Sequence, residues 1–165
     1  MLLSKSCLYG VRAAMYMATV EQSEYVTIHQ ISEKLNISFH FLTKILQTLT
    51  ENNIMVSYRG PKGGVALARP SKEIRLIEIV DAIDGTSIFS ECIFGLPGCG
   101  NMTPCPLHGE WEREREKIRR MFSDTTLAIL AEKINVFNLR ISDTENMPLD
   151  AKALAGVMAT VRKRK

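Results

Sequence analysis

The sequence predicts a mainly α-helical fold, in which a winged helix-turn-helix domain with a small β wing precedes a long C-terminal helix. Three observations lead to this fold class. Two short stretches with helical apolar spacing flank a break at residues 36–38. Two β-prone segments joined by a Gly- and Pro-rich turn follow within residues 54–67. A highly charged stretch with one apolar stripe then extends over residues 109–138.

The first part of the chain contains three predicted helices. Residues 4–21 carry one apolar stripe at helical spacing, and Cys7 lies beside it, so we expect Cys7 to be buried and unreactive. A second helix begins at Thr27, because Gln30 stands three residues later at the capping-box spacing. After the break, Ser38 can cap a third helix.

The third helix has two different faces. Its buried stripe should consist of Leu42, Ile45, Leu46 and Leu49. The other face carries no acidic side chain and is rich in hydrogen-bond donors, which suits the major groove of DNA. The candidate DNA-reading residues are Ser38, His40, Thr43, Lys44 and Gln47. The alternative is a helix pair that only packs a core.

The predicted wing pairs residues 54–58 with residues 65–67. Its turn consists of Arg59, Gly60, Pro61, Lys62, Gly63 and Gly64, all of which are candidate DNA contacts. Arg59 and Lys62 place two cations at the tip, where a phosphate or a minor groove can receive them. Residues 37–69 carry four basic side chains against one acid, so this region is more basic than the net charge of +3 suggests. The alternative is that the turn's charges are merely solvated.

A short helix is expected over residues 74–83, ended by Gly85, and an irregular loop should follow to residue 107. The loop contains the spacing C-x6-C-x5-C-x2-H, formed by Cys92, Cys99, Cys105 and His108. Three thiolates and an imidazole can bind a metal. By composition alone, zinc and an iron–sulphur cluster are about equally supported. A disulfide with one odd thiol, or three solvent-facing cysteines, is the other interpretation.

A long helix is predicted from about residue 106 to residue 138, with Trp111 near the cysteine loop. Most of its charges should be solvated. Its apolar stripe consists of Trp111, Ile118, Met121, Phe122, Ile129 and Leu130. A small domain with such a helix needs a partner surface. We therefore expect a homodimer that pairs this dimerisation helix, so that two recognition helices meet the half-sites of a palindromic operator.

Several classes of protein are not indicated. The chain has no Walker motif, no G-x-S-x-G and no H-E-x-x-H, so an enzyme is not expected. No run of eighteen apolar residues predicts a membrane span, and the N-terminus does not read as a signal peptide, so we expect a cytoplasmic location. Residues 139–165 should form a tail that is partly disordered and ends in four basic residues.

Two runs also resemble a known family. Residues 31–38, ISEKLNIS, and residues 59–64, RGPKGG, resemble the winged-helix regulators that include the iron–sulphur regulator IscR and the nitric-oxide sensor NsrR. The resemblance extends over about residues 1–135 by the order of motifs. It implies double-stranded DNA as a partner and three loop cysteines that hold an iron–sulphur cluster.

The resemblance also bears on the cluster ligands. The run from Cys105 to His108 is similar to the arrangement in which a histidine is the fourth ligand of a [2Fe-2S] centre. The first cysteine gap is six residues, where IscR has five, so [4Fe-4S] stays open as the lesser alternative. Leu8 stands where the nitric-oxide sensors have an acidic ligand, and it cannot bind iron. A sample prepared in air can lack the cluster.

The expected organisation is therefore a DNA-binding winged helix-turn-helix domain over residues 1–85, a cluster-binding loop over 86–108, a dimerisation helix over 109–138 and a tail over 139–165. The expected function is that of a transcriptional repressor that senses redox state, nitric oxide or iron–sulphur status. A change at the cluster would reorder the loop and alter DNA affinity. The alternatives are a winged-helix regulator without a cluster, controlled by a protein or metabolite, and a zinc-stabilised interaction module.

Overall fold

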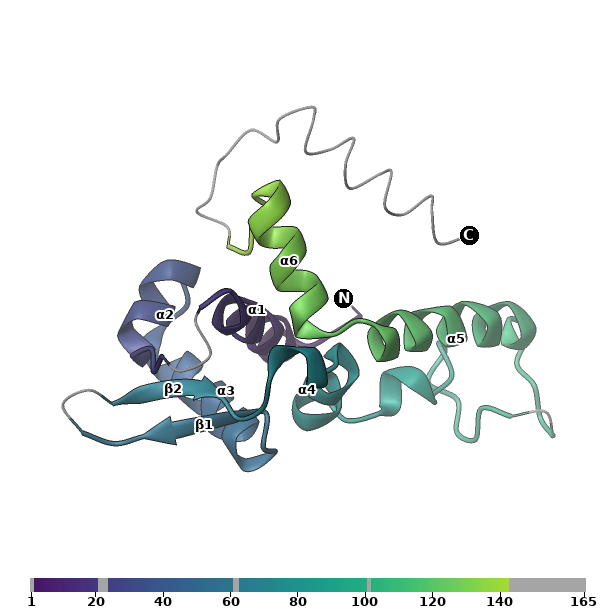
Figure 1. The fold of residues 1–165 in the computed structure, drawn as a ribbon. Coiled ribbons are helices and arrows are strands. Elements are labelled where there is room, and N and C mark those ends of the chain that lie inside the picture. Colours follow the sequence, from purple (N-terminus) through teal and green to yellow (C-terminus); the bar gives the residue numbers. More distant parts are fainter. Residues whose placement is uncertain (1, 21–23, 61–62, 101, 143–165) are drawn as a thin grey trace.

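A computed structural model describes residues 2–20, 24–60, 63–100 and 102–142 (Figure 1). The predicted fold class is confirmed: this part of the chain is mainly helical, with one two-stranded antiparallel sheet. The helices are α1 (Lys5–Thr19), α2 (Ile28–Leu35), α3 (Phe39–Glu51), α4 (Leu76–Ile83), α5 (His108–Asp124) and α6 (Leu127–Phe137). The strands are β1 (Met55–Tyr58) and β2 (Gly64–Leu67), and short 3-10 turns lie at Ser71–Glu73 and Ser87–Phe89.

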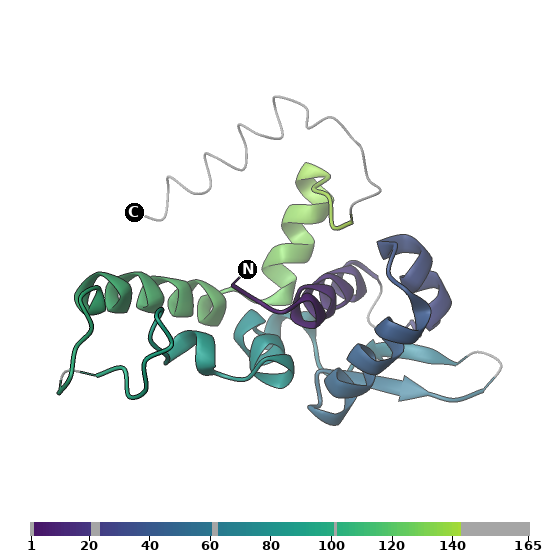
Figure 2. The ribbon, with the colours of Figure 1, turned by 180° about the vertical axis from the view of Figure 1, so that it is seen from behind.

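The molecule is elongated. The β1–β2 hairpin lies at one end, α5 with the loop before it lies at the other, and α1 and α4 lie between them (Figures 1 and 2). Helix α6 packs against α1 and leads away from the axis of α5. The hairpin and the cysteine loop are therefore far apart, so any influence of one on the other has to pass through the middle of the chain.

The first helix of the helix-turn-helix, α2, begins as its capping residues predict. The Thr27 hydroxyl accepts a hydrogen bond from the Gln30 backbone N–H (3.2 Å), and the Gln30 side chain accepts one from the Thr27 backbone N–H (2.9 Å). Asn36 ends α2 in the left-handed region, at φ 52°. Ser38 occupies the N-cap position of α3, but its side chain makes no capping hydrogen bond, which corrects that prediction. The Ser38 side chain is instead exposed.

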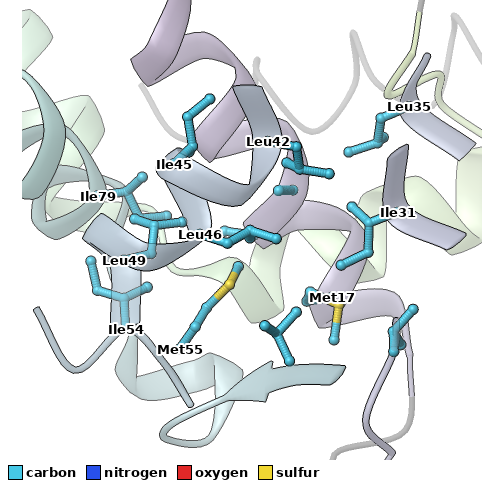
Figure 3. Close-up of a cluster of buried hydrophobic side chains, with 14 of the residues drawn as sticks. Met17, Ile31, Leu35, Leu42, Ile45, Leu46, Leu49, Ile54, Met55 and Ile79 are labelled. Carbon is cyan, nitrogen blue, oxygen red and sulfur yellow. The ribbon is translucent and has the colours of Figure 1, made fainter. Parts of the chain in front are cut away.

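The core is built on the predicted stripe of α3. All four of its members, Leu42, Ile45, Leu46 and Leu49, are buried. Figure 3 shows them facing side chains from α1, α2, β1 and α4: Met17, Ile31, Leu35, Met55 and Ile79. Burial of this stripe fixes the rotation of α3 about its own axis and leaves the opposite face free of core contacts.

The wing is held to the body of the protein. Met55 pairs with Leu67 and Tyr58 pairs with Gly64 in the antiparallel register. Val26, just before α2, exchanges two backbone hydrogen bonds with Val65, of 3.0 and 2.9 Å. A Cβ atom at Gly64 would collide with the Val26 carbonyl, so glycine is needed for this close approach. The hairpin is thereby tied to the start of α2.

The single long helix predicted over residues 106–138 is wrong, because the chain breaks between α5 and α6 at Thr125 and Thr126. These residues are extended and pair with the segment before α4. Leu76 N–H donates to the Thr125 carbonyl (3.0 Å), and Leu127 N–H donates to the Ile74 carbonyl (2.9 Å). The Thr126 hydroxyl then caps α6 by accepting from the Ile129 N–H (3.4 Å).

The break redirects the second half of the predicted dimerisation stripe. Ile129 and Leu130, the predicted members of the stripe in α6, are half-buried, whereas Leu127 and Ala131 are buried within this chain, in a helix that packs against α1. The predicted tail beyond residue 142 lies outside the described residues. Among the helices that the structure describes, none is long and apolar enough to cross a membrane.

Candidate functional site

The outward face of α3 presents most of the predicted DNA-reading side chains. Ser38, His40, Lys44 and Gln47 are exposed. Thr43 is only half-exposed, and its hydroxyl donates to the Phe39 carbonyl of the preceding turn (2.8 Å). The Gln47 side-chain amide donates to the Glu51 carboxylate (3.0 Å). Lys44 and His40 therefore have the more available donors on this face.

The wing presents Arg59 to solvent at the end of β1. Gly60 follows at φ 139°, a backbone angle that residues with a side chain rarely adopt. Glycine at this position therefore allows the turn to form. Gly63 and Gly64 are partly covered by backbone and allow the turn to close on β1 and on Val26. A side chain at either position would collide with the backbone, so the fold itself requires glycine at both. Pro61 and Lys62 lie outside the described residues.

Two tyrosines extend this surface and were missed by sequence reasoning. Tyr58 is 58% exposed and Tyr25 is 40% exposed, and their ring centroids lie 5.6 Å apart. Tyr58 directly precedes Arg59 in the chain. Nothing in the sequence places Tyr25 beside Tyr58, because their proximity follows from the pairing of Val26 with Val65. Two phenol hydroxyls thus accompany the exposed guanidinium at the turn end of the wing.

The four predicted metal ligands come together at the other end of the molecule. Cys92 Sγ lies 3.6 Å from Cys105 Sγ, and Cys99 Sγ lies 3.7 Å from His108 Nδ1. Cys92 and His108 are buried, at 7% and 9% exposed, whereas Cys99 and Cys105 are half-buried. All four cysteines of the chain are free thiols, so the structure contains none of the disulfides considered as an alternative.

Helix α5 holds this loop in place. The His108 N–H, at the start of α5, donates to the Cys105 carbonyl (3.0 Å). Trp111 Nε1 donates to the Glu91 carbonyl (2.9 Å), so Trp111 does lie beside the loop. Arg115 Nη1 reaches the Ser90 and Glu91 carbonyls at 3.0 and 2.9 Å, and Cys99 Sγ at 3.3 Å. The sequence did not indicate this role of Arg115, because in the sequence it resembles the other arginines on the solvent-exposed face of the helix.

The thiols of the loop differ in acidity. A hydrogen bond from the Phe94 backbone N–H, with smaller contributions from the Cys105 and Cys99 thiols, lowers the pKa of Cys92 against the effect of its burial. Burial, with the neighbouring Cys92, raises the pKa of Cys105. Cys92 therefore ionises before Cys105. A thiolate is the form that binds metal, so the surroundings of Cys92 favour its ligand form.

The arrangement can be compared with what metals require. Among the residues that the structure describes, no three His, Cys, Asp or Glu side chains form a group that could hold one metal ion. The ligands instead form two close pairs, Cys92 with Cys105 and Cys99 with His108. Two sulphur ligands about 2.3 Å from a tetrahedral metal lie about 3.8 Å apart, and a sulphur–nitrogen pair lies slightly closer. Each pair has roughly the separation that suits one metal centre.

Cys7 lies apart from this loop, on α1. It is fully buried, as predicted, and packs with Val80 of α4 and Phe122 of α5. Burial, followed by the charge of Asp84 and a hydrogen bond to it, raises the pKa of the Cys7 thiol to about 12. Its role is to fill the space between these helices.

Comparisons with known proteins agree on one family. Residues 3–133 match the family model for Rrf2, described as an iron-dependent transcriptional regulator. The HTH-type transcriptional regulator IscR of Serratia proteamaculans is 30% identical over 138 residues, which cover 84% of this chain and 82% of that protein. The crystal structure of Staphylococcus aureus CymR is 28% identical with a TM-score of 0.65, covering 78% of this chain and 97% of that one.

A further solved structure supports the fold alone. CymR, the global cysteine regulator of B. subtilis, is 23% identical with a TM-score of 0.68 and covers 79% of this chain and 95% of that one. The chain therefore spans most of the length of each protein to which it is compared.

We predict that, in the folded metal-free protein at about pH 8, iodoacetamide modifies the half-buried Cys99 and leaves Cys7 unmodified. The raised pKa of Cys7 keeps its thiol protonated until the pH approaches about 12, and the core excludes the reagent. Peptide mass spectrometry measures the modification at each site. All four cysteines should react in concentrated denaturant. Native labelling of Cys7 at the rate of Cys99 would contradict this assignment.

Proposed function

This chain belongs to the Rrf2 family of transcriptional regulators, and we propose that it binds operator DNA as a homodimer whose affinity is set by an iron–sulphur cluster in the loop over residues 92–108. Its relatives are transcriptional regulators and not enzymes. The observation that carries the cluster proposal is the convergence of Cys92, Cys99, Cys105 and His108 as two close pairs.

The DNA surface is proposed from burial and charge. The core stripe of α3 faces inward, so His40 and Lys44 on its other face remain available to base edges and phosphates of a major groove (Figure 3). The wing adds the exposed guanidinium of Arg59, with Tyr58 beside it, for an adjacent minor groove or phosphate. We further assign contacts at the proposed interface to Ser38, Thr43, Gln47, Gly60, Pro61, Lys62, Gly63 and Gly64.

The cluster proposal follows from the ligand pairs. A single zinc ion needs all of its ligands around one centre, whereas a [2Fe-2S] cluster takes two ligands on each of two irons. The pairs Cys92 with Cys105 and Cys99 with His108 match the second requirement, which favours [2Fe-2S] over zinc and over [4Fe-4S]. When bound, such a cluster supplies one-electron redox chemistry and reactivity toward oxidants and nitric oxide.

The route from the loop to the DNA surface begins at α5. Trp111 and Arg115 attach the loop to α5 through the Glu91 carbonyl. Further along α5, Phe122 packs in one cluster with Cys7 and Val80, which belong to α1 and α4. The end of α5 is then bound to the start of α4, because the Arg75 side chain donates to the Ser123 carbonyl (2.9 Å). A change in the order of the loop would therefore be passed through α5 to the position of α4.

The route continues from α4 to the wing through one ion pair. The Arg69 guanidinium, two residues after β2, lies 2.7 Å from the Glu78 carboxylate of α4. Burial alone would raise the pKa of Glu78, but hydrogen bonds from the Arg75 backbone N–H and from Arg69 outweigh it and lower that pKa. The carboxylate is thus ionised at neutral pH. Arg69 also donates to the Asn53 carbonyl before β1 (3.4 Å), so it joins α4 to both strands of the wing.

Dimerisation is proposed through α5. Met121 is 57% exposed on this helix although Phe122 beside it is buried, which leaves an apolar side chain without cover in the single chain. Several of its charged residues pair within the helix, as Arg119 and Arg120 do with Glu116, whose pKa these partners lower to about 2. A two-fold dimer through α5 would carry two copies of α3 to the half-sites of a palindromic operator.

Arg59→Ala should weaken binding to a duplex, selected from a random pool by the wild-type protein, by about tenfold, because one groove or phosphate contact is lost. If Arg59 contacts a phosphate, the slope of log K against log salt should also fall by about 0.9. Fluorescence anisotropy at several salt concentrations measures both. Arg113→Ala, on α5 at the other end of the molecule, is the matched control. Equal affinities of the two variants would exclude Arg59 from the interface.

Anaerobic purification should yield a coloured protein with about two irons and two sulphides per chain. Cys105→Ser should be colourless, since it removes one ligand, whereas Cys7→Ala should keep the cluster. Metal and sulphide analysis with visible absorption measures this. Zinc without sulphide would support a single-ion site, and four irons would support [4Fe-4S]. If the wild-type protein contains no metal after reconstitution, the cluster proposal is wrong and the alternative of a regulator without a cluster remains.

Glu78→Gln should reduce the ratio of DNA affinities between cluster-loaded and cluster-free protein by about threefold, because it removes the charge that ties α4 to Arg69. Glu73→Gln is the control, since its exposed side chain lies near the same arginine, which contacts only its carbonyl. Binding titrations of both states of both variants give the ratios. An unchanged ratio in Glu78→Gln would rule out this route.

A further inference from the structure

We propose that Arg115 sets the reduction potential of the cluster by placing its charge against the ligand Cys99. The proposal rests on the proposed function, because it presupposes a cluster on Cys99. Beyond the four ligands, it assigns a role at the cluster to Arg115, which binds no metal itself. The spacing of the ligands in the sequence does not reveal this role.

The contacts of Arg115 hold its guanidinium in one position. Its Nη1 atom donates to the Ser90 carbonyl at 3.0 Å and to the Glu91 carbonyl at 2.9 Å, and it lies 3.3 Å from Cys99 Sγ. The two carbonyls come from the segment that leads into Cys92. Arg115 therefore joins the first and second cysteine segments of the loop to α5, while its charge points at a ligand sulphur.

The other arginines of α5 lie close to glutamates of the same helix. Arg119 and Arg120 pair with Glu116 at 2.8 and 2.9 Å, and Arg113 lies 3.8 Å from Glu110 with a side chain that is 68% exposed. Over the part of the chain that the structure describes, Arg115 makes no ion pair with a carboxylate. Its charge is therefore not neutralised by a neighbouring acid and acts on the sulphur.

The effect on the potential has a definite sign. Reduction adds one negative charge to a cluster and its ligands, and a cation or hydrogen-bond donor close to a ligand sulphur stabilises that charge. Arg115 should therefore raise the potential, and its removal should lower it. The half-buried position of Arg115 and Cys99 limits screening by water, so the interaction is stronger than between two fully exposed groups.

The experiment is a dye-mediated reductive titration with dithionite, followed by visible absorption, on anaerobically purified full-length protein. Arg115→Gln should shift the equilibrium between oxidised and reduced forms about tenfold toward the oxidised form, which is 59 mV for a one-electron couple. Arg115→Lys keeps the charge and should stay within about threefold of wild type. Arg113→Gln, two residues away, should match wild type.

The outcomes separate this proposal from the proposed function. A wild-type protein without iron and sulphide would end both. A wild-type cluster whose potential is the same in Arg115→Gln and Arg113→Gln would overturn only the role of Arg115. If Arg115→Gln cannot hold a cluster, Arg115→Lys decides: a potential near wild type supports the role of charge, and a tenfold shift overturns it.

Discussion

The backbone pairing between residues 74–76 and residues 125–127 is the constraint on which the arrangement of the molecule depends. It stops α5 at Asp124, turns the chain into α6 and fixes the end of α5 to the start of α4. Together with Phe122 of α5, which packs against Cys7 of α1 and Val80 of α4, it sets the direction of α5 relative to the winged domain. With it, the loop, α4 and the wing are parts of one connected structure.

Local patterns in the sequence were sufficient to predict the helices that bury one face. The apolar stripe of α3 and the capping box at Thr27 depend on neighbours within one or two turns, so their spacing predicts them. The break at Thr125 could not be predicted in this way, because its hydrogen-bond partners, Ile74 and Leu76, lie far away in the sequence. Periodicity continues across the break, and only tertiary pairing interrupts the helix.

The candidate site shows the same division. Residue type and spacing identified Cys92, Cys99, Cys105 and His108, since three of the four cysteines of the chain fall in one loop and a histidine follows directly after it. Arg115 was not identified, because arginines are abundant on α5 and only the folded loop distinguishes this one from its neighbours. Tyr25 likewise gained its place beside Tyr58 from strand pairing that no local pattern encodes.

The fixed attachment of the wing at Val26 and Gly64 has a consequence for how an operator is chosen. A hairpin that cannot tilt freely keeps a nearly constant span between its tip and α3. The duplex then has to adjust its groove width and bend to that span, at an elastic cost that differs between base steps. Part of the sequence preference would therefore arise from the stiffness of DNA, at base pairs that no side chain touches.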